Sequence, residues 1–128
     1  MGSTPTPGIF LRIRSDPRQI FVLKFVVVVK RKPDWTPEKF RDYFVRVHGP
    51  LAERIPGLRR YKQNFPVPDA KRKPPQWDCV VELYFDDKER MEAAWMTPEG
   101  EAATADLEVF ADLAQTTWSI VEERTVVA

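Results

Sequence analysis

The stretch from Ile20 to Arg31 constrains the fold more than any other part of this sequence. It is rich in Val and Phe, β-branched and aromatic residues that suit a pleated surface, and Pro33 ends it. Both alternating sets of side chains are apolar, namely Val22, Val26 and Val28 in one set and Phe21, Leu23, Phe25, Val27 and Val29 in the other. Because a strand of this kind needs cover on both sides, we expect a sheet with a layer packed on each face.

The first helix is predicted from Thr36-Pro37-Glu38, where Thr36 can cap the helix, Pro37 has the right φ and Glu38 suits the dipole. Gly49-Pro50 is expected to interrupt or end this helix near His48, because proline disfavours helical geometry in the residue before it. The expected core-facing stripe is Phe40, Phe44, Val47 and Leu51.

The remainder of the chain predicts three more strands and a second helical region. The strands are expected at Leu58–Asn64, Cys79–Phe85 and Trp118–Val127, with a proline-rich loop at 65–76. Asp86–Trp95 is expected to be a helix, and Thr97-Pro98-Glu99 begins another. The core stripe of that last helix is Ala103, Leu107 and Phe110, with Leu113 beyond.

This order of elements, β, α, β, β, α, β, predicts an α+β, ferredoxin-like domain with a four-stranded antiparallel sheet and helices on one face. Residues 20–128 would form the domain and residues 1–19 a flexible extension, since 128 residues leave no room for a second domain of ordinary size. The face without helices needs a partner, so we expect a two-fold homodimer that packs sheet against sheet.

Composition argues against several classes of function. With 20 Lys+Arg against 19 Asp+Glu, the net charge of +1 does not favour nucleic acid or an anionic membrane. One Cys and one His provide neither an internal disulfide nor a zinc cluster, and no Gly-rich phosphate loop or paired-carboxylate metal cluster is visible, so we expect no cofactor. The apolar runs are too short to span a membrane, no secretory signal is visible, and the unpaired Cys79 favours the cytoplasm.

Several motifs together make the sequence similar to the EthD family, over about residues 21–127. They are Phe40-Arg41-Asp42-Tyr43-Phe44, Val47-His48-Gly49-Pro50-Leu51-Ala52, Pro56-Gly57-Leu58, and Arg60-Tyr61 with Asn64. Such sequences often carry Trp where this one has Phe44. The resemblance implies a dimeric α/β barrel made of two ferredoxin-like protomers, with a small-molecule pocket between helices and sheet in each. The wider superfamily includes cofactor-independent monooxygenases, cyclases, isomerases, lyases and haem-degrading enzymes, and the fold alone does not choose among them.

His48 is the only histidine, so any imidazole acid–base chemistry must use it. A helix C-terminus would favour its charged form and an apolar pocket its neutral form, and the plainer alternative is a ring that caps the helix end. Tyr43, five residues earlier, converges with His48 only if the helix distorts, and could instead be a tyrosine at the edge of the core.

The remaining candidates are assigned to substrate binding: Tyr61, Asn64, Phe44, Trp95 and Glu82. Tyr61 and Asn64 point to opposite faces of a regular strand, so at most one should face the pocket. Glu82 could partner His48, pair with Lys24 across the sheet, or face a dimer interface. We expect Trp35 and Trp118 to serve packing, and Cys79 to be a small buried hydrophobe.

These residues lead to one preferred hypothesis with two alternatives. The preferred function is a homodimeric, cofactor-independent enzyme of isomerase, cyclase or lyase type, acting on a cyclic or aromatic molecule. His48 would move a proton while Tyr43, Tyr61 or Asn64 holds an oxyanion or enolate. The alternatives are a non-catalytic carrier of a hydrophobic metabolite and a haem-binding protein with His48 as axial ligand.

Overall fold

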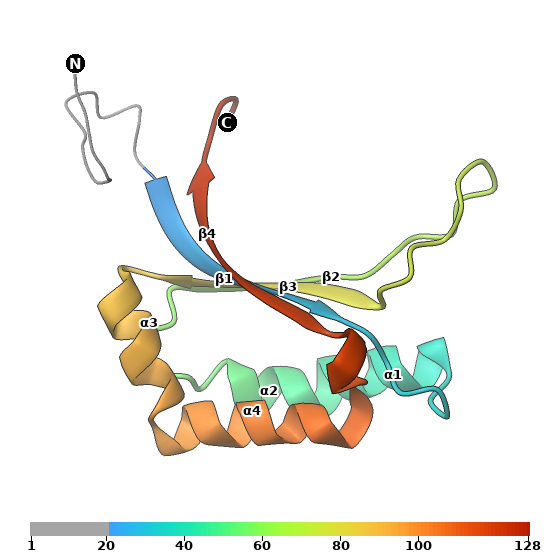
Figure 1. The fold of residues 1–128 in the computed structure, drawn as a ribbon, viewed down its shortest axis with the longest axis horizontal. Coiled ribbons are helices and arrows are strands. Elements are labelled where there is room, and N and C mark those ends of the chain that lie inside the picture. The colour runs from blue at the N-terminus through green and yellow to red at the C-terminus, as the bar shows by residue number, and fades with distance from the viewer. Residues whose placement is uncertain (1–20) are drawn as a thin grey trace.

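The computed structural model describes residues 21–128, and the extension predicted at 1–19 lies outside them. The chain folds as an α+β, ferredoxin-like domain, as the order of elements predicts, with all its helices on one side of a single sheet (Figure 1). The strands are β1 (Phe21–Val29), β2 (Arg60–Asn64), β3 (Cys79–Phe85) and β4 (Thr117–Arg124). They lie antiparallel in the order β2-β3-β1-β4.

Within residues 21–128, the helical layer consists of four α-helices and two short turns of other winding. These are α1 (Pro37–Tyr43), the π-helical η2 (Phe44–His48), α2 (Gly49–Ala52), α3 (Lys88–Trp95), α4 (Pro98–Phe110) and the 3₁₀ turn η3 (Leu113–Gln115). Each longer helix begins at a side-chain cap: Thr36 accepts from the N–H of Lys39, Asp87 from that of Arg90, and Thr97 from that of Gly100. No helix in the described range combines the length and apolar character that a membrane crossing needs.

The sheet separates two different environments because its side chains alternate. Val27 of β1 pairs with Val81 of β3, and both are buried against the helices. The neighbouring Val26, opposite Glu82, points to the other face, which no helix of the described chain covers (Figure 1). The buried core lies between sheet and helices and contains Val27, Val29, Phe40, Phe44, Ala52, Ile55, Cys79, Val81, Leu83, Phe85, Met91, Ala94, Ala103, Leu107, Phe110 and Ala111.

The regular helix is interrupted next to Gly49-Pro50, as predicted, but by a π-turn at Phe44–His48 and not by the proline, because helical geometry continues through Gly49-Pro50 to Ala52. Gly49 has φ −55° and ψ −50°, which is ordinary helical backbone. Proline disfavours helical geometry in the preceding residue partly by a clash with the Cβ of that residue. The residue before Pro50 is Gly49, which has no Cβ. The N–H of Gly49 bonds the carbonyl of Phe44, five residues back, which is the bond that defines a π-turn.

This π-turn also changes which side chains are buried. The predicted stripe includes Val47, but Val47 is 42% exposed, whereas His48 is buried. A π-turn holds more residues than an α-turn, so each residue beyond Phe44 is rotated back relative to a regular helix. The buried side of the segment is therefore Phe40, Phe44, His48 and Ala52.

Smaller differences concern the ends of elements. β2 begins at Arg60 rather than Leu58, and β4 ends at Arg124 rather than Val127. Leu113, predicted to extend the core stripe of the last helix, lies beyond the end of α4 in η3 and is exposed. The strand at Cys79–Phe85 has the predicted bounds.

Candidate active site

A cavity of about 490 Å³ lies between the helical layer and the sheet. Its volume is within the range of small-molecule pockets. β1, β2, β3 and β4 form one wall, and η2, α2, the end of α3 and α4 form the other. The lining residues are Phe25, Val27, Val29, Phe44, His48, Ala52, Ile55, Tyr61, Val81, Leu83, Trp95, Glu101, Ala103, Thr104, Ala105, Leu107, Glu108 and Trp118.

His48 lines this cavity and binds the carboxylate of Asp106 from α4. Its Nδ1 lies 3.0 Å from Oδ2 of Asp106, and its side chain is almost completely buried. A carboxylate only accepts hydrogen bonds, so Nδ1 carries the proton and donates it. In a neutral ring, Nε2 is then an unprotonated acceptor.

Burial keeps the ring of His48 neutral. The ring packs against the aromatic rings of Phe44 and Phe110, whose centroids lie 5.0 and 5.1 Å away. This burial lowers the pKa of His48 below its ordinary value and outweighs Asp106, which raises it. At neutral pH, His48 is therefore a base that Asp106 orients.

Tyr43 binds the other oxygen of the same carboxylate. Its hydroxyl donates to Oδ1 of Asp106 over 2.7 Å. Tyr43 precedes the π-turn η2 and His48 is its last residue, and this turn is the helix distortion that their spacing of five residues requires. Burial, and then Asp106, raise the pKa of Tyr43 to about 12, so it stays a proton donor. Tyr43 does not line the cavity, which assigns it to positioning rather than to contact with a ligand.

Tyr61, Phe44 and Trp95 all line the cavity, as substrate-binding residues must. The hydroxyl oxygen of Tyr61 accepts a hydrogen bond of 3.0 Å from Nε2 of Gln63, which leaves its own proton available. Burial raises the pKa of Tyr61 to about 12, so it too is a donor at neutral pH.

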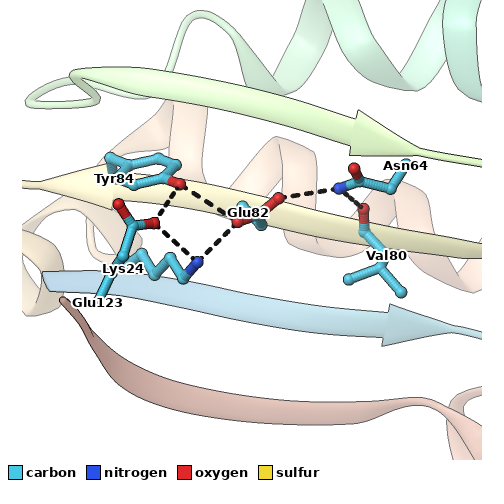
Figure 2. Close-up of polar contacts among 6 residues, drawn as sticks. All are labelled: Lys24, Asn64, Val80, Glu82, Tyr84 and Glu123. Atoms are coloured by element: carbon cyan, nitrogen blue, oxygen red, sulfur yellow. Dashed lines mark hydrogen bonds and ion pairs between the residues drawn. The ribbon is translucent and has the colours of Figure 1, made fainter. Parts of the chain in front are cut away.

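Asn64 and Glu82 lie on the opposite face of the sheet and do not line the cavity (Figure 2). The strand alternation that separates Tyr61 from Asn64 is thus observed. Asn64 donates to the carbonyl of Val80 and to Oε2 of Glu82. Of the three alternatives for Glu82, the structure has the ion pair with Lys24, at 2.7 Å.

A polar network surrounds that ion pair on the face without helices. Nζ of Lys24 also lies 3.0 Å from Oε1 of Glu123, and the hydroxyl of Tyr84 donates to the same oxygen of Glu123 (Figure 2). Burial opposes the charge of Lys24, but its hydrogen bonds to the two glutamates raise its pKa overall. Lys24 in turn lowers the pKa of Glu82. One lysine thus joins two glutamates from neighbouring strands, so the network is a structural element of this face.

One residue has a role other than the predicted one, and another was not identified from the sequence. Trp118, expected in packing, is 42% exposed and lines the cavity. Asp106 was not identified, although its position carries a signal. It lies three residues after Ala103 and four before Phe110, so a carboxylate borders the core stripe of α4 and needs a buried partner.

The described residues show no other obvious chemical centre. Cys79 is fully buried, as expected, and burial raises its pKa to about 12, which disfavours thiolate chemistry. In the range 21–128, no group of three or more His, Cys, Asp or Glu side chains is arranged to hold a metal ion.

Comparison with known proteins agrees with this fold. A family model described as EthD domain matches residues 32–114. An uncharacterized 11.0 kDa protein in the thcB-thcC intergenic region of Rhodococcus erythropolis is 30% identical over 90 residues, which cover 70% of this chain and 85% of that protein. The crystal structure of an ethyl tert-butyl ether D family protein from Bacillus halodurans superposes with a TM-score of 0.69 at 29% identity, covering 80% of this chain and 98% of the other.

More distant structures share the fold at lower sequence identity. A dimeric ferredoxin-like protein of unknown function from Thermobifida fusca has a TM-score of 0.59 at 16% identity, covering 82% of this chain and 92% of that one. SnoaB, a cofactor-independent oxygenase from Streptomyces nogalater, has a TM-score of 0.58 at 15% identity, covering 84% of this chain and 98% of its own. At these identities the likeness shows the fold alone.

Proposed function

This chain belongs to the EthD family, and on that premise we propose that it is a cofactor-independent enzyme that transfers a proton on a cyclic or aromatic organic molecule. The reaction would be of isomerase, cyclase or lyase type. SnoaB, a cofactor-independent oxygenase, has the same fold, which supports the proposal at the level of the fold.

One observation carries the proposal: His48 lines an apolar cavity with Nδ1 fixed by Asp106, which leaves Nε2 as the basic nitrogen. The substrate's O–H or activated C–H proton would pass to Nε2, and the electron pair of the broken bond would stay on the substrate as an oxyanion or enolate. Asp106 would stabilise the imidazolium that forms. Tyr61 would donate a hydrogen bond to the anion, an interaction commonly worth a few kcal/mol when preorganised.

We further propose that the protein is a homodimer that packs sheet against sheet. The face without helices carries apolar side chains from β1, β3 and β4 around the Lys24 network, among them Val26, Val28, Val80 and Val121. Relatives of the same fold are described as dimeric. Sedimentation should give twice the 14.9 kDa of one chain, and a species of 14.9 kDa at every concentration would contradict the dimer.

The catalytic proposal is tested by turnover together with a signal from the single histidine. A panel of phenols, lactones and polyketide-like compounds is incubated with the protein while the ring protons of His48 are followed by NMR. A compound that shifts this signal and is consumed should be consumed at least about a hundredfold more slowly by His48→Asn. Tyr43→Phe, which removes a contact to Asp106 but leaves His48 and the cavity lining in place, should change the rate only through the pKa of His48 and therefore far less than His48→Asn.

The rival function is a carrier that sequesters a hydrophobic metabolite, and the apolar lining of the cavity favours it. A carrier needs the cavity but not the base. If compounds bind, none is consumed, and His48→Asn binds them as well as the original chain does, the carrier function replaces the enzymatic one.

A further inference from the structure

We propose that the cavity selects uncharged, flat aromatic molecules that carry a hydroxyl group and that it rejects organic acids of the same shape. This inference rests on the proposed function for the identity of the site, since it names the ligand of the same cavity. It concerns binding, however, and can be tested without any turnover.

Aromatic side chains give the cavity its preference for flat ligands. Phe25 lies between Trp95 and Trp118, with ring centroids 5.2 and 6.1 Å away, and all three line the cavity. They come from β1, the end of α3 and β4, so the aromatic surface spans both layers. Aromatic side chains stack against flat rings in offset or edge-to-face geometry. A planar ligand of one to a few fused rings suits this wall.

The charges at the cavity all have one sign. Among the described residues that line it, no Lys or Arg is present, whereas Glu101 and Glu108 are. Glu101 and Glu108 lie on one face of α4 together with Thr104 and Ala105, because residues three or four apart share a helix face. All four of these residues are exposed. The carboxylates therefore border the cavity where ligands enter, and they repel an approaching anion.

The polar groups deeper in the cavity match a neutral hydroxyl. Nε2 of the neutral His48 accepts a hydrogen bond, and the hydroxyl of Tyr61, whose oxygen is already bonded by Gln63, donates one. A ligand O–H can donate to the first and accept from the second. A carboxylate has no proton to donate to Nε2, and no cation on the described cavity wall compensates its charge.

The test uses three probes with the same ring system: naphthalene, naphthol and naphthoate. Naphthol and naphthoate carry their substituent at the same ring carbon. Their affinities for the full chain are measured by calorimetry at neutral pH, where naphthol is uncharged and naphthoate is an anion. We expect naphthol to bind more tightly than naphthalene, and naphthoate more weakly than naphthol by roughly tenfold or more.

Two double variants test whether the carboxylates of Glu101 and Glu108 repel an anionic ligand. Glu101→Gln/Glu108→Gln should tighten naphthoate binding several-fold while it leaves naphthalene unchanged. The control is Glu89→Gln/Glu92→Gln, which makes the same change in net charge on the exposed side of α3, away from the cavity lining. It should change the affinity of neither naphthoate nor naphthalene. Naphthoate binding as tight as that of naphthol, an equal response to the two double variants, or no binding by naphthol would each overturn the proposal. Absence of turnover bears on the proposed function alone.

Discussion

Tyr43 and His48 bind the two oxygens of one carboxylate, with the Tyr43 hydroxyl 2.7 Å from Oδ1 of Asp106 and Nδ1 of His48 3.0 Å from Oδ2. Residues five apart do not share a face of a regular α-helix, and the π-turn at Phe44–His48 makes this convergence possible. The carboxylate is thus held from both sides, and its charge is divided between a phenol and an imidazole. Changing either partner should alter the basicity of the histidine.

Asp106→Asn should lower the pKa of His48 further. The carboxylate is the group that raises this pKa against the effect of burial, and an amide carries no charge. The measurement is an NMR titration of the ring protons, which belong to a single residue. An unchanged or raised pKa would contradict the assignment of Asp106 as the partner that supports protonation.

Tyr43→Phe should shift the same pKa in the opposite direction. Without the phenol, the negative charge of Asp106 is shared with one donor only, so it attracts the proton of His48 more strongly. The lost hydrogen bond should also cost about 0.5–1.5 kcal/mol of unfolding free energy. Both effects can be read from one sample series, by NMR titration and urea denaturation. A pKa that falls, as in Asp106→Asn, would show that the two partners do not compete for the carboxylate.

Stability should decrease as the pH falls below about 6.5, the ordinary pKa of histidine. Because burial places the folded-state pKa of His48 lower, the unfolded chain binds more protons between the two values, and protons there favour unfolding. Each unit of pKa difference corresponds to about 1.4 kcal/mol. Urea denaturation from pH 7.5 down to 5 measures this, and His48→Asn is the control that should lose the slope. An equal slope in both proteins would assign the effect to other groups.

Lys24→Met should destabilise the sheet by about 1–3 kcal/mol. Lys24 bridges Glu82 and Glu123, and its removal leaves two partly buried carboxylates close together without the cation that binds both of them. Denaturation at pH 7 gives the cost. The double variant Lys24→Met/Glu82→Gln should recover part of it, because one of the uncompensated charges is gone. If the double variant is less stable than the single variant, the charge argument fails.

Gly100→Ala should destabilise the fold by about 1–3 kcal/mol, although alanine is the better helix former. A Cβ at this position would lie 2.1 Å from the carbonyl oxygen of Ala94, so the backbone of α3 or α4 would have to move. Ala102→Gly, at an exposed position of the same helix, measures the propensity effect alone, about 1 kcal/mol. A Gly100→Ala protein at least as stable as the original would show that the contact between α3 and α4 yields easily.

The sheet and the helical layer could be predicted from the sequence, because the strongest sequence patterns depend on residues close to one another in the chain. Thr36 and Thr97 cap the helices that they were predicted to begin, and β1 is the strand predicted from its two-sided apolar pattern. The same alternation places Tyr61 and Asn64 on opposite faces. Propensity, capping and periodicity depend on neighbours in sequence, and a single chain contains them.

The geometry of the candidate site could not be predicted, because it depends on packing between segments that are distant in the sequence. A π-turn has no composition of its own, so the burial of His48 in place of Val47 follows only from the way the helix packs. Asp106 is 58 residues from His48, and no periodicity joins two residues on different helices. Whether Glu82 pairs with Lys24 or reaches His48 was left open for the same reason, because the register of the strands decides between them.

The alternation along β1 divides one strand between two independent tasks. Phe25, Val27 and Val29 form part of the cavity wall, while Lys24, Val26 and Val28 belong to the face proposed for self-association. Because adjacent positions of β1 point to opposite sides, substitutions at its odd-numbered residues would change the cavity wall while the even-numbered residues, on the face proposed for self-association, stay as they are. In this strand, ligand preference and self-association would therefore be able to change independently of each other.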